Sequence, residues 1–148
     1  MVKELIRFIY VIAGNLHRAW MIPLMGHYSR HPEKYSERFC YEYNKHAIRL
    51  MNHTGRIYTQ AYGAENLPKD GGYVMFANHQ GKYDALGIML THEEPCSVVM
   101  DEARSKMPLV KQFIDMVGGK RLCLHDLRQA ARVIREVSKE VEYGRKYI

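Results

Sequence analysis

The chain passes from an apolar run to a polar turn in the stretch Tyr73-Val74-Met75-Phe76-Ala77-Asn78-His79-Gln80-Gly81-Lys82-Tyr83-Asp84, and an apolar-rich segment follows at 85–90. An apolar run, a glycine-bearing turn and a second apolar segment are typical of a strand that leads into a helix. In α/β proteins the carboxyl end of a strand is a common place for binding and catalytic residues. The stretch therefore predicts a strand at 73–77, a helix from about Asp84, and a candidate site between them.

The candidate site is centred on His79 and Asp84, which are five positions apart. Within one helix that spacing would turn the side chains about 140° away from each other, so one of them must lie off the helix. With His79 in the turn and Asp84 in or near the first helical turn, the carboxylate can hold one imidazole nitrogen while the other acts as a base. No serine, threonine or cysteine stands beside the pair, so His79 is expected to activate a hydroxyl of the substrate. The alternative is a surface histidine and an aspartate that only favours the helix N-terminus.

In its setting after a strand, the run from Asn78 to Asp84 resembles the first motif of the glycerolipid acyltransferases, the family that includes 1-acylglycerol-3-phosphate acyltransferase. The segments 63–68, 100–110 and 126–130 also resemble parts of that family, so the resemblance runs from about Tyr58 to the C-terminus. It implies that His79 deprotonates the acceptor hydroxyl, that Asp84 orients His79, and that the resulting alkoxide attacks an acyl thioester.

The sequence departs from that family at two later motifs. The second motif of the family carries an arginine that helps bind the acceptor phosphate, and Leu124 stands at its place, so Lys120 and Arg121 are expected to supply the charge from the same strand. The third motif, a Phe-Pro-Glu-Gly-Thr-Arg type of segment, is absent, and residues 144–148 read as a helix end followed by the first residues of a strand. We therefore expect a C-terminally incomplete domain, truncated before the third motif and inactive by itself.

The N-terminal segment predicts a cationic amphipathic helix. Its apolar face carries Leu5, Ile6, Phe8, Ile9, Ile12, Ala13, Leu16, Ala19 and Trp20. The other face carries Lys3, Arg7 and Arg18, with Val11 as the exception. Such a helix can lie in the plane of an anionic membrane surface. The alternative is that its apolar face packs on the rest of the protein.

A membrane-spanning helix is not expected in this segment. The uncharged run at 8–16 is too short, because a bilayer of about 30 Å needs about 20 apolar residues. Extending the run to Ser29 would place Arg18 near its centre at about 2.5 to 3.5 kcal/mol, and Pro23 would break the helix. We therefore expect peripheral or in-plane association with the cytoplasmic face of a membrane.

The rest of the chain predicts helices alternating with strands. A second amphipathic helix is expected within 33–53, strands at 57–62, 97–100 and 121–124, and helices at 108–116 and 126–143, the last capped by Asp126. This order predicts an α/β fold with a central mixed sheet covered by helices and preceded by an N-terminal amphipathic helical pair. We expect membrane-associating helices at 1–54 and an acyltransferase domain at 55–148.

Composition narrows the possible partners. The chain has 148 residues, enough for one core, and a net charge of +6. That charge suits anionic lipid surfaces, phosphorylated substrates or nucleic acid. The sequence contains no nucleic-acid-binding motif, so nucleic acid is not expected as a partner. The three cysteines, Cys40, Cys96 and Cys123, lack metal-like spacing, so they are expected to be reduced thiols. The resemblance implies no metal or organic cofactor.

The resemblance implies an O-acyltransferase that moves a fatty acyl group from acyl carrier protein or coenzyme A to 1-acylglycerol-3-phosphate, giving phosphatidate. Donors at Asn78, Gly81 and Lys82 are expected to stabilise the oxyanion or the acceptor phosphate at the helix N-terminus. Two alternatives stay open: an acyltransferase for another glycerolipid acceptor, and a truncated, non-catalytic protein that binds lipid surfaces.

Overall fold

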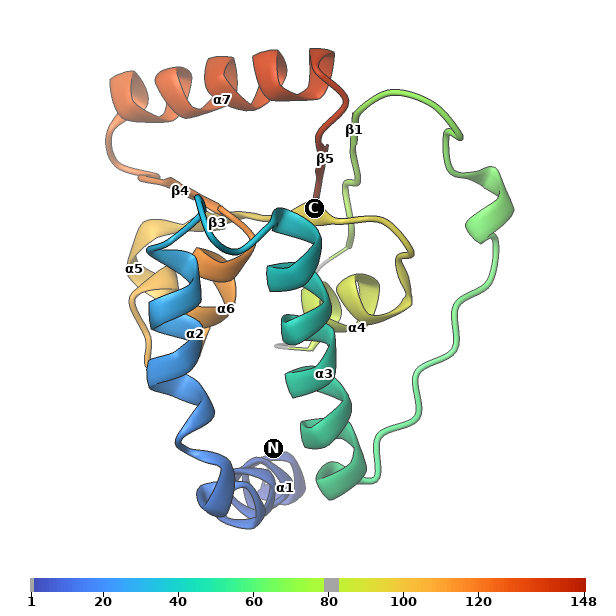
Figure 1. The fold of residues 1–148 in the computed structure, drawn as a ribbon, viewed down its shortest axis with the longest axis vertical. Helices are drawn as coiled ribbons and strands as arrows, with labels where there is room; N and C mark the ends of the chain where they lie inside the picture. Colours follow the sequence, from blue (N-terminus) through green and yellow to red (C-terminus); the bar gives the residue numbers. More distant parts are fainter. Residues whose placement is uncertain (1, 79–82) are drawn as a thin grey trace.

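The computed structural model describes residues 2–78 and 83–148 and has an α/β fold, which confirms the predicted class (Figure 1). The helices are α1 (Val2–Gly14), α2 (Met21–Ser29), α3 (Glu37–Gly55), α4 (Asp84–Thr91), α5 (Glu102–Ser105), α6 (Val110–Met116) and α7 (Leu127–Glu142), with 3-10 turns η1 (Leu16–Arg18) and η2 (Ala64–Asn66). The strands are β1 (Tyr73–Val74), β2 (Cys96–Ser97), β3 (Val99–Asp101), β4 (Lys120–Leu122) and β5 (Lys146–Tyr147).

The described strands form two small parallel sheets where one central mixed sheet was expected. One sheet has the order β1-β5-β2, and the other pairs β3 with β4. Lys146 of β5 lies opposite Tyr73 on one side and opposite Cys96 on the other. The residues that the sequence indicated as the start of a new strand therefore form the centre of the first sheet, where Tyr147 is fully buried.

The strands lie between α7 on one face and α2, α3, α4 and α6 on the other (Figure 1). Under α7, Val133, Val137 and Tyr147 form a small apolar cluster. On the opposite face a larger core joins the helices, and its buried members include Met25, Tyr41, Ile48, Met89, Cys96, Phe113 and Ile114. Helices α2 and α3 thus share one core with the segments around the predicted site.

Helix α7 matches the helix predicted at 126–143. The Asp126 side chain caps it by accepting hydrogen bonds from the backbone N–H groups of Arg128 and Gln129, both at 3.0 Å. Val133 and Val137 are buried on the same face, one turn apart, as the helical spacing requires. Gly144 then adopts φ 93°, a left-handed conformation that glycine tolerates and that turns the chain into β5.

The strand predicted at 57–62 is wrong. Helix α3 ends with Arg56 in a left-handed conformation, and the chain then runs from 57 to 63 with neither helix nor strand. Tyr58 and Tyr62 are 92% and 87% exposed. The alternation of side chains in this segment is that of an extended backbone, but a strand also requires a hydrogen-bonded neighbour, and none of the described strands pairs with it.

Helix α1 docks on α3 through the face that was predicted to be polar. Val11, the one apolar residue on that face, meets Gly55, where a Cβ atom would lie only 2.9 Å from the Val11 Cγ2 atom. A Cβ atom on Gly14 would likewise lie 2.5 Å from the Thr54 Cγ2 atom. The two glycines let the helices approach closely, and Arg18 donates hydrogen bonds to Asn15 at 2.7 Å and to Thr54 at 3.4 Å.

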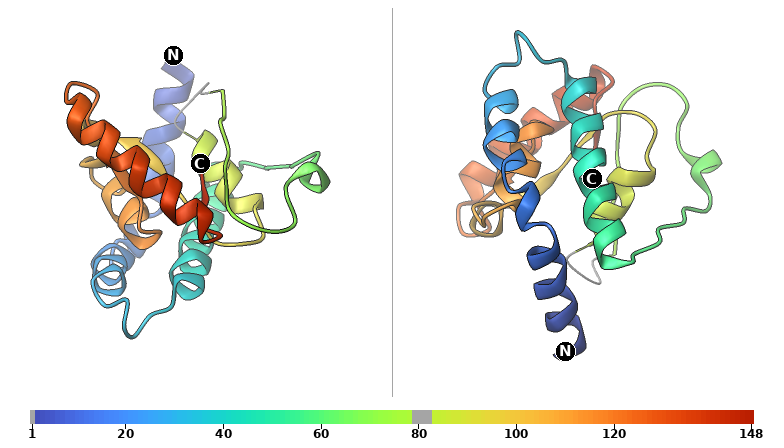
Figure 2. Two further views of the ribbon diagram at one scale, coloured as in Figure 1. Left: turned by 90° about the horizontal axis from the view of Figure 1, so that it is seen from above. Right: turned by 60° about the horizontal axis from the view of Figure 1, so that its bottom comes forward.

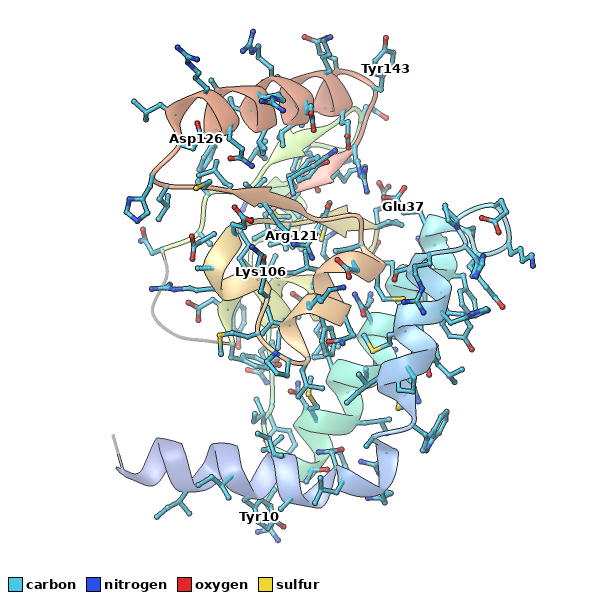
Figure 3. The ribbon with its side chains drawn as sticks, turned by 90° about the vertical axis from the view of Figure 1, so that its left-hand side faces the viewer. Tyr10, Glu37, Lys106, Arg121, Asp126 and Tyr143 are labelled. Atoms are coloured by element: carbon cyan, nitrogen blue, oxygen red, sulfur yellow. The ribbon has the colours of Figure 1, made fainter. Side chains whose placement is uncertain are left out.

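The apolar face of the N-terminal segment points away from the body, so the alternative of a packed apolar face is wrong for its described side chains. The residues on this face that are 39% to 65% exposed are Ile6, Ile9, Ile12, Leu16 and Trp20. Figures 2 and 3 show α1 at one end of the molecule, and Figure 3 shows that Tyr10, which lies beside this face, is directed outward. The pattern indicated the residues of the apolar face, but it could not indicate whether that face is exposed or packed on the protein.

The chain bends between α1 and α2, and Pro23 lies in the first turn of α2, where proline fits a helix. The predicted break therefore falls at 15–20, ahead of the proline. Across residues 2–78 and 83–148, none of the helices has the length and apolar character needed to cross a bilayer.

A partly buried carboxylate ties β4, α7 and β5 together. Glu140 is 2.5 Å from the Lys120 ammonium and 2.6 Å from the Arg145 guanidinium, and it accepts a hydrogen bond of 2.5 Å from the Tyr147 hydroxyl. Burial pushes the pKa of Glu140 upward, but these three partners outweigh burial and lower the pKa to about 2. The ionised carboxylate therefore stabilises the folded chain.

We expect Glu140→Gln to destabilise the chain at neutral pH. The lowered pKa corresponds to about 3 kcal/mol for a shielded group, and partial solvent exposure reduces this to roughly 1 to 2 kcal/mol. Because the folded pKa lies below the ordinary value of 4.5, the contribution is present above about pH 4.5 and is lost as the pH falls towards 2. Urea unfolding at about pH 7 and about pH 2.5 measures it.

The exposed Glu142, on the same helix, provides the matched control, and Glu142→Gln should leave the free energy of unfolding nearly unchanged. A destabilisation by Glu140→Gln that stayed the same at both pH values would contradict this account.

Candidate functional site

A cleft of about 390 Å³ lies beside α4 at the carboxyl end of β1, where the sequence predicted a site. Its lining comes from three segments of the chain: Thr59, Gln60, Ala61 and Tyr62 from the extended segment, Ala77 and Asn78 after β1, and Tyr83, Asp84, Gly87, Ile88 and Thr91 at and within α4. The cleft is thus formed by the strand-to-helix junction together with the segment that was predicted to be a strand.

The structure brings two of the predicted site residues to this cleft. Asn78 is exposed and follows β1, and Asp84 is half-buried and is the first residue of α4. His79, Gly81 and Lys82 lie outside the described residues, so their predicted roles stay predictions. The predicted place of Asp84 in the first helical turn is confirmed.

The N-terminus of α4 gives this part of the cleft a positive character. The first backbone N–H groups of a helix have no partner within the helix and carry partial positive charge, which favours anions nearby. Asp84 lies in this first turn, and the side chain of the N-cap residue Tyr83 makes no capping hydrogen bond. A carboxylate held here is well placed both to orient a base and to be stabilised by the helix.

Tyr83 is a site residue that sequence reasoning missed. Its hydroxyl lies 2.6 Å from the Asn52 side-chain amide and 2.6 Å from the Thr59 hydroxyl, and both Tyr83 and Thr59 line the cleft. Asn52 is buried near the end of α3. No local signal indicated these contacts, because they join three segments that are far apart in the sequence.

Lys120 and Arg121, the residues predicted to hold the acceptor phosphate, lie on β4 and do not line the cleft. Lys120 pairs with Glu140 at 2.5 Å, and Arg121 pairs with Asp115 and donates a hydrogen bond to Ser105 at 3.1 Å. Figure 3 shows Arg121 within the body of the protein. Both cations thus have protein partners, and their role towards phosphate stays a prediction.

Asp115 is held in its ionised form by its neighbours. Burial pushes the pKa of Asp115 upward, but the hydrogen bonds from Lys111 and Arg121 outweigh burial and hold the pKa below its ordinary value. The pair between Asp115 and Arg121 links α6 to β4. Its arrangement is that of a structural ion pair.

A second polar cluster is buried behind α4. His92 is hydrogen-bonded through both ring nitrogens, to the Tyr73 hydroxyl at 2.6 Å and to the Glu94 carbonyl at 2.6 Å. The Tyr41 hydroxyl lies 3.2 Å from the Cys96 thiol, whose pKa is raised chiefly by burial. A thiol in this setting is a poor nucleophile, so the cluster has a structural role.

Within the described part of the chain, no three His, Cys, Asp or Glu side chains are grouped as ligands of a metal ion. The three cysteines are free thiols, with Cys40 and Cys96 buried and Cys123 partly exposed. Among the described residues that line the cleft, the side chains offer a carboxylate, amide and hydroxyl groups to a substrate.

Comparisons with known proteins agree with the position of the cleft. A family model described as Acyltransferase matches residues 59–148, which include β1, α4 and every residue that lines the cleft. Neither the curated proteins nor the solved structures give a match. Because the matched segment covers more than half of the 148 residues, the chain belongs to the glycerolipid acyltransferase family.

Proposed function

We propose that the protein is a membrane-associated O-acyltransferase that moves a fatty acyl group from acyl carrier protein or coenzyme A to the free hydroxyl of 1-acylglycerol-3-phosphate. The product is phosphatidate, so the reaction is a step of phospholipid synthesis. The family supports acyl transfer in general. The observation that carries the proposal is the cleft at the end of β1, because Asn78 and Asp84, which stand on either side of residues 79–82, both line it.

His79 is assigned the role of general base. Its imidazole takes the proton of the acceptor hydroxyl, and the hydroxyl oxygen attacks the carbonyl carbon of the thioester. The tetrahedral intermediate then breaks its C–S bond, and the imidazolium gives the proton to the departing thiolate. The products are the new ester and the free thiol of the carrier. The proton of the acceptor hydroxyl ends on the thiol, and the C–S bond that breaks is replaced by the new C–O bond.

Asp84 is assigned the role of orienting His79, as its place in the first turn of α4 supports. The oxyanion of the intermediate needs hydrogen-bond donors aimed at it. Asn78, Gly81 and Lys82 are assigned to that task or to the acceptor phosphate, together with the N-terminal amides of α4. The exposed side-chain amide of Asn78 at the cleft is consistent with this assignment.

The two cations predicted to hold the acceptor phosphate already have carboxylate partners. Lys120 and Arg121 would have to exchange their carboxylate partners for the phosphate, since both are already in ion pairs. An acyltransferase acting on another glycerolipid acceptor is therefore the second candidate. A non-catalytic protein that binds lipid surfaces is a third candidate, favoured by the exposed face of α1.

Access to lipid is assigned to the N-terminal helix. The exposed face of α1 and the turn that follows it carries Ile9, Leu16 and Trp20, which are more than half exposed and can insert among lipid headgroups and acyl chains. Arg18 is turned towards α3, where it donates a hydrogen bond to Thr54, and not towards this exposed face. Peripheral, in-plane association with the cytoplasmic face of a membrane follows from this proposal.

We expect His79→Ala to lower acyl transfer by about 10² to 10⁴, because the acceptor hydroxyl loses its positioned base. Asp84→Asn should leave a small residual rate. The test uses this chain joined to a Phe-Pro-Glu-Gly type of segment, which the 148 residues do not contain and without which we expect little turnover. The assay follows a labelled acyl group transferred to 1-acylglycerol-3-phosphate in mixed micelles.

The matched controls are His125→Ala, at an exposed histidine, and Asp126→Asn, which removes the charge of another carboxylate at a helix N-terminus. Both should retain their activity. Near-normal turnover in His79→Ala would remove the central claim, and robust turnover by the 148-residue chain that disappeared on His79→Ala would contradict the expected inactivity.

We expect the combined variant Ile9→Gln, Leu16→Gln, Trp20→Gln to bind anionic vesicles at least about a hundredfold more weakly, because each of the three apolar side chains withdrawn from lipid forfeits roughly 1 kcal/mol or more. Vesicle flotation measures the bound fraction. Substitutions are preferable to deletion through Met25, since Met21 and Met25 belong to the core.

The control variant Leu127→Gln, Ile134→Gln changes two exposed apolar residues on α7, which lies at the other end of the molecule (Figure 1). It should bind vesicles as the parent chain does. Equal flotation of the α1 variant and the parent chain would rule out the proposed lipid surface.

A further inference from the structure

The Tyr83 side chain links α4 to two other segments of the chain. Its hydroxyl lies 2.6 Å from the Asn52 Nδ2 atom and 2.6 Å from the Thr59 Oγ1 atom. Because the Asn52 amide donates to the tyrosine oxygen, the tyrosine hydrogen is available for Thr59. The Asn52 amide also lies 3.5 Å from the Thr59 hydroxyl, so the three groups form one hydrogen-bonded cluster that joins α3, Tyr83 and the extended segment lining the cleft.

Asn52 is held in place by the end of α3. Its side chain is 7% exposed, and its backbone carbonyl accepts a hydrogen bond of 2.9 Å from the N–H group of Ile57. That bond closes the end of α3, where Arg56 takes a left-handed conformation. The anchor for Tyr83 is thus set by the backbone of a long helix.

The aromatic ring of Tyr83 is also held against α4 itself. A Cβ atom at Gly87 would lie 3.1 Å from the Tyr83 Cε1 atom, so a glycine leaves room for the ring along the first turn. The Gly87 N–H group donates to the Tyr83 carbonyl at 2.8 Å, the first hydrogen bond of the helix. Both the ring and the backbone of Tyr83 are therefore fixed at the residue before Asp84.

We infer that Tyr83 is a positioning residue: through Asn52 and Thr59 its hydroxyl fixes the first turn of α4, and this directs the Asp84 carboxylate to His79. The inference rests on the proposed function, in which Asp84 orients His79. A planar peptide joins Tyr83 to Asp84, so a shift of Tyr83 moves the start of the Asp84 side chain with it. Loss of the hydroxyl should loosen the carboxylate without removing it.

The pKa of His79 provides a readout that a purely structural role would not move. A carboxylate beside an imidazole favours the imidazolium and raises its pKa. The measurement follows the histidine signals by NMR as a function of pH, in the 148-residue chain labelled with ¹³C-histidine and held in detergent micelles. The His79 signal is identified by its loss in His79→Gln.

We expect Asp84→Asn to lower the pKa of His79 by about one unit or more. Tyr83→Phe should lower it by a part of that amount, and Thr59→Val, which keeps the shape of the side chain, by a similar or smaller part. Tyr62→Phe is the matched control, since it removes an exposed hydroxyl from the same cleft and should leave the pKa of His79 unchanged. In the joined protein, Tyr83→Phe should reduce kcat about tenfold with little change in KM.

The outcomes separate the inference from the proposed function. If Asp84→Asn lowers the pKa of His79 but Tyr83→Phe and Thr59→Val leave it at the parent value, the positioning role is overturned while the proposed function stands. If Asp84→Asn leaves it unchanged, the pairing of His79 with Asp84 fails and the inference fails with it. Should Tyr83→Phe not fold, Thr59→Val alone decides, because it removes the hydroxyl that is hydrogen-bonded to Tyr83.

Discussion

The rest of the structure depends on hydrogen bonds donated by the buried face of α3. The last carbonyl groups of a helix have no partner within the helix, and burying one without a partner costs about 1 to 3 kcal/mol. The Tyr41 hydroxyl donates to the Met89 carbonyl near the end of α4, and the Asn44 amide donates to the Phe113 carbonyl near the end of α6, both at 2.9 Å. These bonds allow both short helices to end inside the protein and fix them relative to α3.

The same face of α3 also holds the turn after α4. Lys45 is 7% exposed, and its ammonium group donates to the His92 carbonyl at 2.9 Å. Helix α3 was predicted as an amphipathic helix, but the pattern did not indicate that Asn44 and Lys45 are buried, because a polar residue in a helical pattern is ordinarily taken to be exposed. The family match begins at residue 59, whereas this support begins in α3. The division of the chain near residue 54 stays a prediction.

The sequence predicted an element well where the interactions that form it lie within the element itself. Helix α7 was predicted with its cap because the Asp126 side chain and the spacing of Val133 and Val137 lie within the element itself. The segment 57–62 was predicted wrongly because a strand depends on a distant partner. For α1 the pattern indicated which residues share the apolar face. Its packing was decided at Gly14 and Gly55, which lie close to Thr54 and Val11 of the facing helices, and hydrophobic periodicity does not predict such a close approach.

In the candidate site, too, local features could be predicted from the sequence and contacts between distant segments could not. The spacing of His79 and Asp84 could be read along the chain, whereas the residues that hold the start of α4 lie 31 and 24 positions from Tyr83. One of them, Asn52, belongs to the last turn of α3, and in the same turn Thr54 and Gly55 contact α1. One helical turn therefore holds Tyr83, before the start of α4, on one side and the outward-facing apolar helix on the other. In the proposed enzyme, this places the lipid-facing surface and the carboxylate on a common rigid support, so an acceptor that stays in the membrane would meet a site at a fixed height above it.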